Sequence, residues 1–162
     1  MLVDDGRVVG HSTVMTHYLD AAYPDRPRLW PREVEAAHAA LEVTSLVDAS
    51  MDILVDLGTR YFTLRGDQGW LAVRNDRMHR AQDAIDKVAA RATSPHLAGS
   101  EWSVADMWTL AATLGIRSWP ARAAQAPLVG QLLTLGFRLP DALSRWAEQH
   151  EKRDDRAIYE TP

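Results

Sequence analysis

Two long segments place apolar residues at alternating steps of three and four, and this spacing constrains the fold most. In residues 32–64 the pattern is kept by Val43, Val47, Ser50, Leu54, Leu57, Tyr61 and Leu64. In residues 71–92 it is kept by Leu71, Met78, Ala81, Ile85, Val88 and Ala92. Such spacing aligns side chains along one stripe of a helix. With the turn residues 66–69 between them, the segments predict an antiparallel helical hairpin in an all-α bundle.

A third helix is expected to begin at Ser103 and to dock between the two helices of the hairpin. Asp106 stands three residues after Ser103, which is the spacing of a capping box. Trp102 and Met107 flank the two residues in the positions of a hydrophobic staple. Two more helices are predicted at 128–137 and 140–151, followed by short helix and coil over 152–162.

The first 24 residues have a different pattern from the rest of the chain. Residues 1–9 resemble two short strands around an Asp5-Gly6 turn, and Ser12 is the predicted N-cap of a helix that stops at Pro24. Because so small a strand pair is marginal by itself, it is expected either to pack on another part of the chain or to be preceded by more sheet. The predicted organisation is a strand-and-helix remnant over 1–24, a linker over 25–31 and a helical domain over 32–162.

Composition narrows the classes of partner and compartment. The formal net charge is −4, the pI is about 5.8, and the basic residues are scattered, so neither nucleic acid nor an anionic membrane is an expected partner. With no cysteine, the chain can form no disulfide and no thiolate metal site. No apolar run approaches the roughly 20 residues that span a bilayer, and the expected compartment is the cytoplasm.

Three segments in order resemble the glutathione transferase family: residues 5–19 (DGRVVGHSTVMTHYL), 97–106 (LAGSEWSVAD) and 139–146 (LPDALSRW). They are similar to the family's glutathione-site segment, to its capping box, and to its proline and tryptophan near the C-terminus. The resemblance covers nearly the whole chain. It implies the family's helical C-terminal domain, preceded by the end of a thioredoxin-like domain.

The resemblance also implies an activity and its limits. The family conjugates glutathione, as a substrate, to a small electrophile, and a homodimer through helices 32–64 and 71–92 is the implied assembly. The glutathione-binding residues would be Ser12 and Thr13, with His11 where the family carries Glu or Gln. The thiol-activating residue and the cis-proline would lie ahead of Met1, so catalytic residues are expected to be absent from this chain and activity to be lost.

Ser12 has two further interpretations besides the family's carboxylate site. A serine at this position also simply caps its helix, and a cap and a carboxylate site use the same geometry. The run from Gly10 to Val14 also imitates the G-x-S-x-G elbow of α/β-hydrolases, although Val14 replaces the second glycine.

Charged residues on the predicted hairpin give two more hypotheses. Glu35 with His38, and Asp76 with His79, have the carboxylate-x-x-His spacing of di-iron bundles, but no further carboxylates stand out to complete a site, and no metal is expected. A second set lies four residues apart on one helix face: Asp48, Asp52, Asp56 and Arg60. It predicts a solvated or interface face with an Asp56–Arg60 pair. The resemblance adds a contact from Asp52 to glutathione bound by the partner subunit.

The sequence pattern does not show which aromatic residues belong to the core and which line a cleft. Most of the six tryptophans are expected in the core, since each buries a large area. Met51, Met107 and Trp108 could instead line a cleft for a hydrophobic substrate. The rival class to an enzyme is a non-catalytic dimerisation or protein-interaction module of the same fold, docking through an exposed apolar surface.

Overall fold

The structure is a computed structural model that describes residues 1–64 and 66–151. This part of the chain is mostly helical and holds one sheet of two antiparallel strands. In order, its elements are β1 (Leu2–Asp4), β2 (Arg7–Val9), α1 (Ser12–Ala22), α2 (Val34–Leu64), α3 (Gln68–Ala89), α4 (Val104–Arg117), α5 (Trp119–Arg122), α6 (Pro127–Thr134) and α7 (Asp141–Glu151). The all-α prediction is therefore confirmed. The tail predicted over 152–162 lies outside the described residues.

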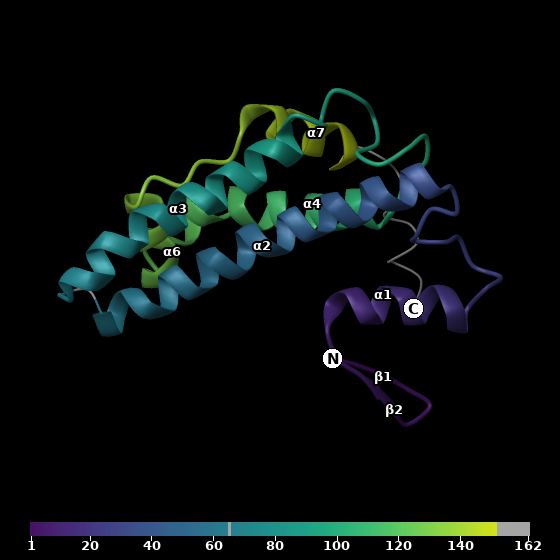
Figure 1. The fold of residues 1–162 in the computed structure, drawn as a ribbon, viewed down its shortest axis with the longest axis horizontal. Helices are drawn as coiled ribbons and strands as arrows, with labels where there is room; N and C mark the ends of the chain where they lie inside the picture. Colours follow the sequence, from purple (N-terminus) through teal and green to yellow (C-terminus); the bar gives the residue numbers. More distant parts are fainter. Residues whose placement is uncertain (65, 152–162) are drawn as a thin grey trace.

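Helices α2 and α3 form the predicted antiparallel hairpin and give the molecule its long axis (Figure 1). The predicted stripe is the buried face of this hairpin, because Val43, Leu57 and Ile85 are fully buried. The Ser50 hydroxyl, also fully buried, donates to the carbonyl of Ala81 at 2.9 Å and so joins the two helices at mid-length.

Helix α4 packs chiefly against α2 and α7, and α6 also packs on α2. This corrects the expectation that the third helix lies between the two helices of the hairpin, because α4 makes its main contacts with only one of them. The core that results is continuous from the hairpin to α7, where Leu143 and Trp146 are buried.

The N-terminal hairpin and α1 form a small ββα unit beside the N-terminal end of α2 (Figure 1). Val3 pairs with Val8, and the turn between the strands places Asp5 and Gly6 at positive φ, 45° and 79°. Two successive residues in this region form the turn that fits the right-handed twist of a hairpin. The predicted hairpin is therefore confirmed.

Several element boundaries differ from the predictions. Helix α3 begins at Gln68 rather than after the predicted 66–69 turn, because the Asp67 carboxylate caps it by accepting the Trp70 amide at 2.7 Å. The predicted helix 128–137 is α6, which ends at Thr134, and the short α5 was not predicted. Within the predicted linker 25–31, Trp30 is buried in the core.

Candidate functional site

The predicted glutathione-binding residues lie at the start of α1. His11 is the N-cap, with φ at 66° and no side-chain cap hydrogen bond, so the predicted cap at Ser12 is wrong by one residue. Ser12 is instead the first helical residue; Ser12 and His11 are exposed and Thr13 is half-buried. A helix start without a side-chain acceptor presents its backbone amides and the positive end of the helix dipole to solvent. The arrangement suits an anion as well as water.

The hairpin is fixed to α1 by one carboxylate. Asp4 accepts hydrogen bonds from the hydroxyls of Tyr18 at 2.7 Å and Tyr23 at 2.8 Å. These two bonds hold the pKa of Asp4 below its ordinary value, and the bond from Tyr18 has the larger effect. They also raise the pKa of both tyrosines. The Arg7 guanidinium lies over the ring of Tyr18, 5.8 Å from its centre.

A second carboxylate fixes α1 to the residues that follow it. Asp20 accepts the backbone amides of Leu29 and Trp30, both at 2.8 Å. The Trp30 indole donates to the buried Thr16 hydroxyl at 3.1 Å and stacks on His17 with the ring centres 4.1 Å apart. We call this set, Thr16, His17, Asp20, Leu29 and Trp30, the α1 clamp. It anchors the ββα unit to the helical body.

The predicted capping box is present at the start of α4. Fully buried Asp106 accepts the Ser103 amide at 2.8 Å, the Ser103 hydroxyl at 3.1 Å and the Leu97 amide at 2.9 Å. The Leu97 bond extends the cap into the preceding loop, which the sequence does not indicate. The rings of His96 and His150 lie near Trp102, and its predicted staple with Met107 stays a prediction.

The acidic row on α2 is not uniformly solvated. Asp48 accepts the Trp108 indole N–H at 2.6 Å, which ties α2 to α4. Asp56 pairs with Arg60, as predicted, and also with Arg77 of α3. Asp52 is exposed, and among the described residues no cation lies within ion-pair distance of it.

The structure does not assemble the two alternative catalytic sites. Glu35, His38, Asp76 and His79 are all exposed, and within the described ranges no three potential ligands of a metal ion lie together. The serine elbow needs a parallel sheet behind it, whereas the described strands form one antiparallel pair.

Most of the tryptophans belong to the core, as predicted. Trp30, Trp70, Trp119 and Trp146 are buried. Met51, Met107 and Trp108, the predicted cleft residues, are partly buried and pack against that core. They line neither the cavity described in the next paragraph nor a smaller one at the tip of the hairpin, which Arg60, Trp70 and Arg77 help to line.

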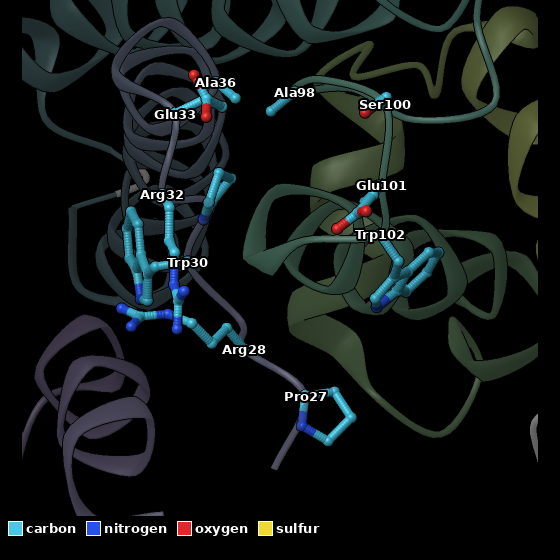
Figure 2. A pocket seen from close by; sticks show the side chains of 11 residues that line it. Pro27, Arg28, Trp30, Arg32, Glu33, Ala36, Ala98, Ser100, Glu101 and Trp102 are labelled. Atoms are coloured by element: carbon cyan, nitrogen blue, oxygen red, sulfur yellow. The ribbon is translucent and has the colours of Figure 1, made fainter. Parts of the chain in front are cut away.

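A cavity of about 700 Å³ lies where residues 27–36 face the loop 98–102. Its volume falls within the range typical of small-molecule sites. Figure 2 shows Arg28 and Arg32 on the same side as the Trp30 ring, with Glu101 and Trp102 on the opposite side. We call this cavity the linker pocket. It is a more enclosed candidate site than the start of α1.

Comparison with known protein families, with curated proteins and with solved structures found no match to this chain. Its function is therefore argued from its own residues. None of the described helices combines the length and the apolar character that crossing a bilayer requires.

Sequence reasoning missed the linker pocket and the α1 clamp. Arg28, Trp30 and Arg32 were assigned to a linker and the first residues of a helix, and Glu101 was considered only as part of a motif. The one available signal was the dense run of bulky and cationic residues between Pro24 and Pro31, which is unusual for a flexible connection.

Proposed function

We propose that the chain is a glutathione transferase-type protein, built from the end of a thioredoxin-like unit and the family's helical domain. The observation that carries this proposal is the buried Asp106 capping box, which starts α4 against the α2–α3 hairpin and follows a ββα unit. This is the element order that the sequence resemblance implies. The finer assignment to that family rests on this order and on the three sequence segments.

At the site level, the proposal is that the amides of Ser12 and Thr13 bind the γ-glutamyl carboxylate of glutathione. Support comes from the exposed start of α1, whose N-cap residue His11 gives the helix amides no side-chain acceptor. Backbone amides at a helix start, together with the helix dipole, favour an anion. The three segments that carry the resemblance include no thiol-activating residue of the family, so we expect residues 1–162 to bind without conjugation.

An NMR titration with glutathione tests this proposal. We expect the amide signals of Ser12 and Thr13 to shift with a Kd in the millimolar range, roughly what a single exposed carboxylate contact supports. Ser12→Ala should weaken the shifts a few-fold, since one hydroxyl is lost while the amides remain. Ser45→Ala, on an exposed position of α2, is the matched control and should change nothing.

Two results would contradict the proposal. Unshifted Ser12 and Thr13 signals at saturating glutathione would remove the site. Measurable conjugation of glutathione to 1-chloro-2,4-dinitrobenzene by residues 1–162 would show that the expected thiol-activating residue is not required.

The second candidate function is a dimerisation or interaction module of the same fold. It is favoured by Val34, Leu41 and Val55, which are exposed although apolar and lie seven and fourteen residues apart on α2. Such spacing places them near one face of the helix. Exposed Asp52 lies one turn from Val55, where a partner's cation or a ligand amine could reach it.

Sedimentation equilibrium decides between a dimer and a monomer. We expect a dimer whose dissociation constant rises at least tenfold in Leu41→Glu, because a charge would be buried in the contact. Val14→Glu, at an exposed apolar position of α1, is the control and should leave the dimer intact. A wild-type chain that stays monomeric at about 100 μM would contradict this second candidate.

A further inference from the structure

The linker pocket is formed by two stretches of chain that are far apart in sequence. Residues 27–36 supply one wall, and the loop 98–102 supplies the other. The two walls are joined by backbone: the Val104 amide donates to the Leu29 carbonyl at 2.7 Å. The pocket is therefore a fixed feature of how the segments pack, and its lining includes none of the residues at the start of α1.

The aromatic parts of the pocket are held in place before any ligand arrives. Trp30 is 7% exposed, and its ring is positioned by the Thr16 hydroxyl and by stacking on His17. Trp102 is 36% exposed and lies against the ring of His150, 5.1 Å between centres. Fixed indoles give a planar apolar body a surface on which to stack at low entropic cost.

One side of the pocket carries two guanidinium groups whose charges are little neutralised by carboxylates of the protein. The nearest carboxylate to Arg28 is Asp20, at 3.9 Å, and both oxygens of Asp20 already accept backbone amides. Among the residues that the structure describes, no carboxylate lies within 4.0 Å of the Arg32 side chain. Neighbouring guanidinium groups in this state favour a carboxylate, which they can bind in a bidentate fashion.

The opposite side carries the opposite charge. Glu101 points across the pocket from the loop before α4, while Glu33 lies beside Ala36, away from the arginine head groups (Figure 2). With two arginines and two glutamates in the lining, the pocket has no net charge to attract a simple anion. Separated charges of opposite sign match a ligand that carries both.

We propose that the linker pocket binds a small aromatic zwitterion, either a free aromatic amino acid or a short peptide with an aromatic residue. Its carboxylate contacts Arg28 and Arg32, its amine contacts Glu101, and its ring stacks on Trp102. This site shares no lining residue with the start of α1, so the proposal stands whether or not glutathione binds there.

Isothermal titration calorimetry with four probes tests the charge pattern. The probes are L-phenylalanine, the dipeptide L-phenylalanyl-glycine, N-acetyl-L-phenylalanine, which lacks the amine, and 2-phenylethylamine, which lacks the carboxylate. We expect at least one of the first two to bind with a Kd of roughly 0.1–1 mM. The two single-charge probes should bind at least fivefold more weakly, and the better of the first two identifies the source of the ligand.

Two variants test the residues, each with a matched control on α7. Arg32→Gln should weaken the zwitterion about tenfold, and Glu101→Gln about fivefold while leaving N-acetyl-L-phenylalanine unaffected. Arg145→Gln and Glu148→Gln, at exposed positions, should change neither value. All four side chains are on the surface, so circular dichroism should show an unchanged fold.

The proposal is overturned if, at about 10 mM, none of the four probes gives a heat of binding or shifts the NMR signal of a tryptophan indole. It is equally overturned if N-acetyl-L-phenylalanine binds as tightly as the zwitterions, since Glu101 would then have no role. Binding that survives both Arg32→Gln and Glu101→Gln would place the ligand elsewhere.

Discussion

Asp106 is a buried carboxylate that accepts three hydrogen bonds, and its removal should be costly. Asp106→Ala leaves the amides of Leu97 and Ser103 without their acceptor in a site with no access to water. An unsatisfied buried donor costs about 1–3 kcal/mol. We expect the free energy of unfolding to fall by about 3–5 kcal/mol, measured by urea denaturation followed by tryptophan fluorescence.

Ser103→Ala is the control, because it removes only a hydroxyl from the same capping box. It should cost about 1 kcal/mol, as the loss of an N-cap side chain usually does. Equal losses in the two variants would mean that Asp106 acts only as a local cap and that its bond to Leu97 adds nothing.

The cluster of Asp4, Tyr18 and Tyr23 predicts a pH dependence with a definite sign. Hydrogen bonds from the tyrosines lower the pKa of Asp4, so their stabilisation is present above its unfolded value, about 3.9, and is lost as the pH falls through the lower folded value. The pKa values of both tyrosines are raised. The same bonds are therefore kept below about pH 10 and lost as the pH rises through the folded values. Carboxyl and ring NMR signals should show both shifts.

Asp4→Asn should return Tyr18 and Tyr23 to ordinary titration, whereas Asp5→Asn should not. Asp5 is a matched control because it is the adjacent exposed acid, and asparagine tolerates its positive φ of 45°. Unaltered tyrosine titration in Asp4→Asn would contradict the assigned hydrogen bonds.

Which single residues could be predicted depended on sequence separation. The capping role of Asp106 follows from a three-residue spacing, which fixes local geometry. The bond from Trp108 to Asp48 joins residues 60 positions apart, and no local pattern reports it. For the same reason the sequence leaves open whether the acidic row is a solvated or an interface face, whereas two of its three carboxylates bind groups on other helices.

At the level of elements, long periodic segments were predicted well and short ones poorly. The apolar spacing that repeats over many turns predicts helices α2 and α3. Helix α5 has only four residues, WPAR, too few for any periodicity. The predicted start of α3 is wrong because the glycines at 66 and 69 suggest a turn. In the structure Asp67 caps the helix, and Gly69 lies within its first turn.

Gly99 is expected to be required where the loop before α4 crosses the start of α2. Its φ is +101°, and an added Cβ would lie 3.1 Å from the Ala36 Cβ. We expect Gly99→Ala to lower the free energy of unfolding by about 2–3 kcal/mol, combining backbone strain with a tight contact. Urea denaturation measures the loss.

Gly136→Ala separates those two causes. Gly136 also has a positive φ, +92°, but no atom lies within 4 Å of the position its Cβ would take. It should cost only the backbone part, about 1–2 kcal/mol. Adding Ala36→Gly to Gly99→Ala should relieve the contact, so the double variant should lose less stability than the sum of the losses in the two single variants. A loss equal to that sum would rule the contact out.

At the level of the whole molecule, the sequence predicted the fold class but not where its parts meet. The linker pocket exists because residues 27–36 lie against 98–102, and the linker was expected to be a simple connection. Its prolines indicated an irregular path, which is correct, yet they say nothing of what that path contacts. Contacts between segments arise from the packing of Trp30 into the core, which depends on the complete arrangement of helices.

The α1 clamp should decide whether the ββα unit and the helical body unfold together. Asp20→Asn replaces one of two accepting oxygens with an amide donor that faces a backbone N–H, so the bond to Leu29 or Trp30 is lost. We expect amide hydrogen exchange in 12–22 to accelerate about tenfold or more, and exchange in 43–57 to change several-fold less. Asp25→Asn, an exposed acid in the adjoining loop, should leave both rates unchanged. Equal acceleration in both segments would show one cooperative unit, with the clamp as part of a single core.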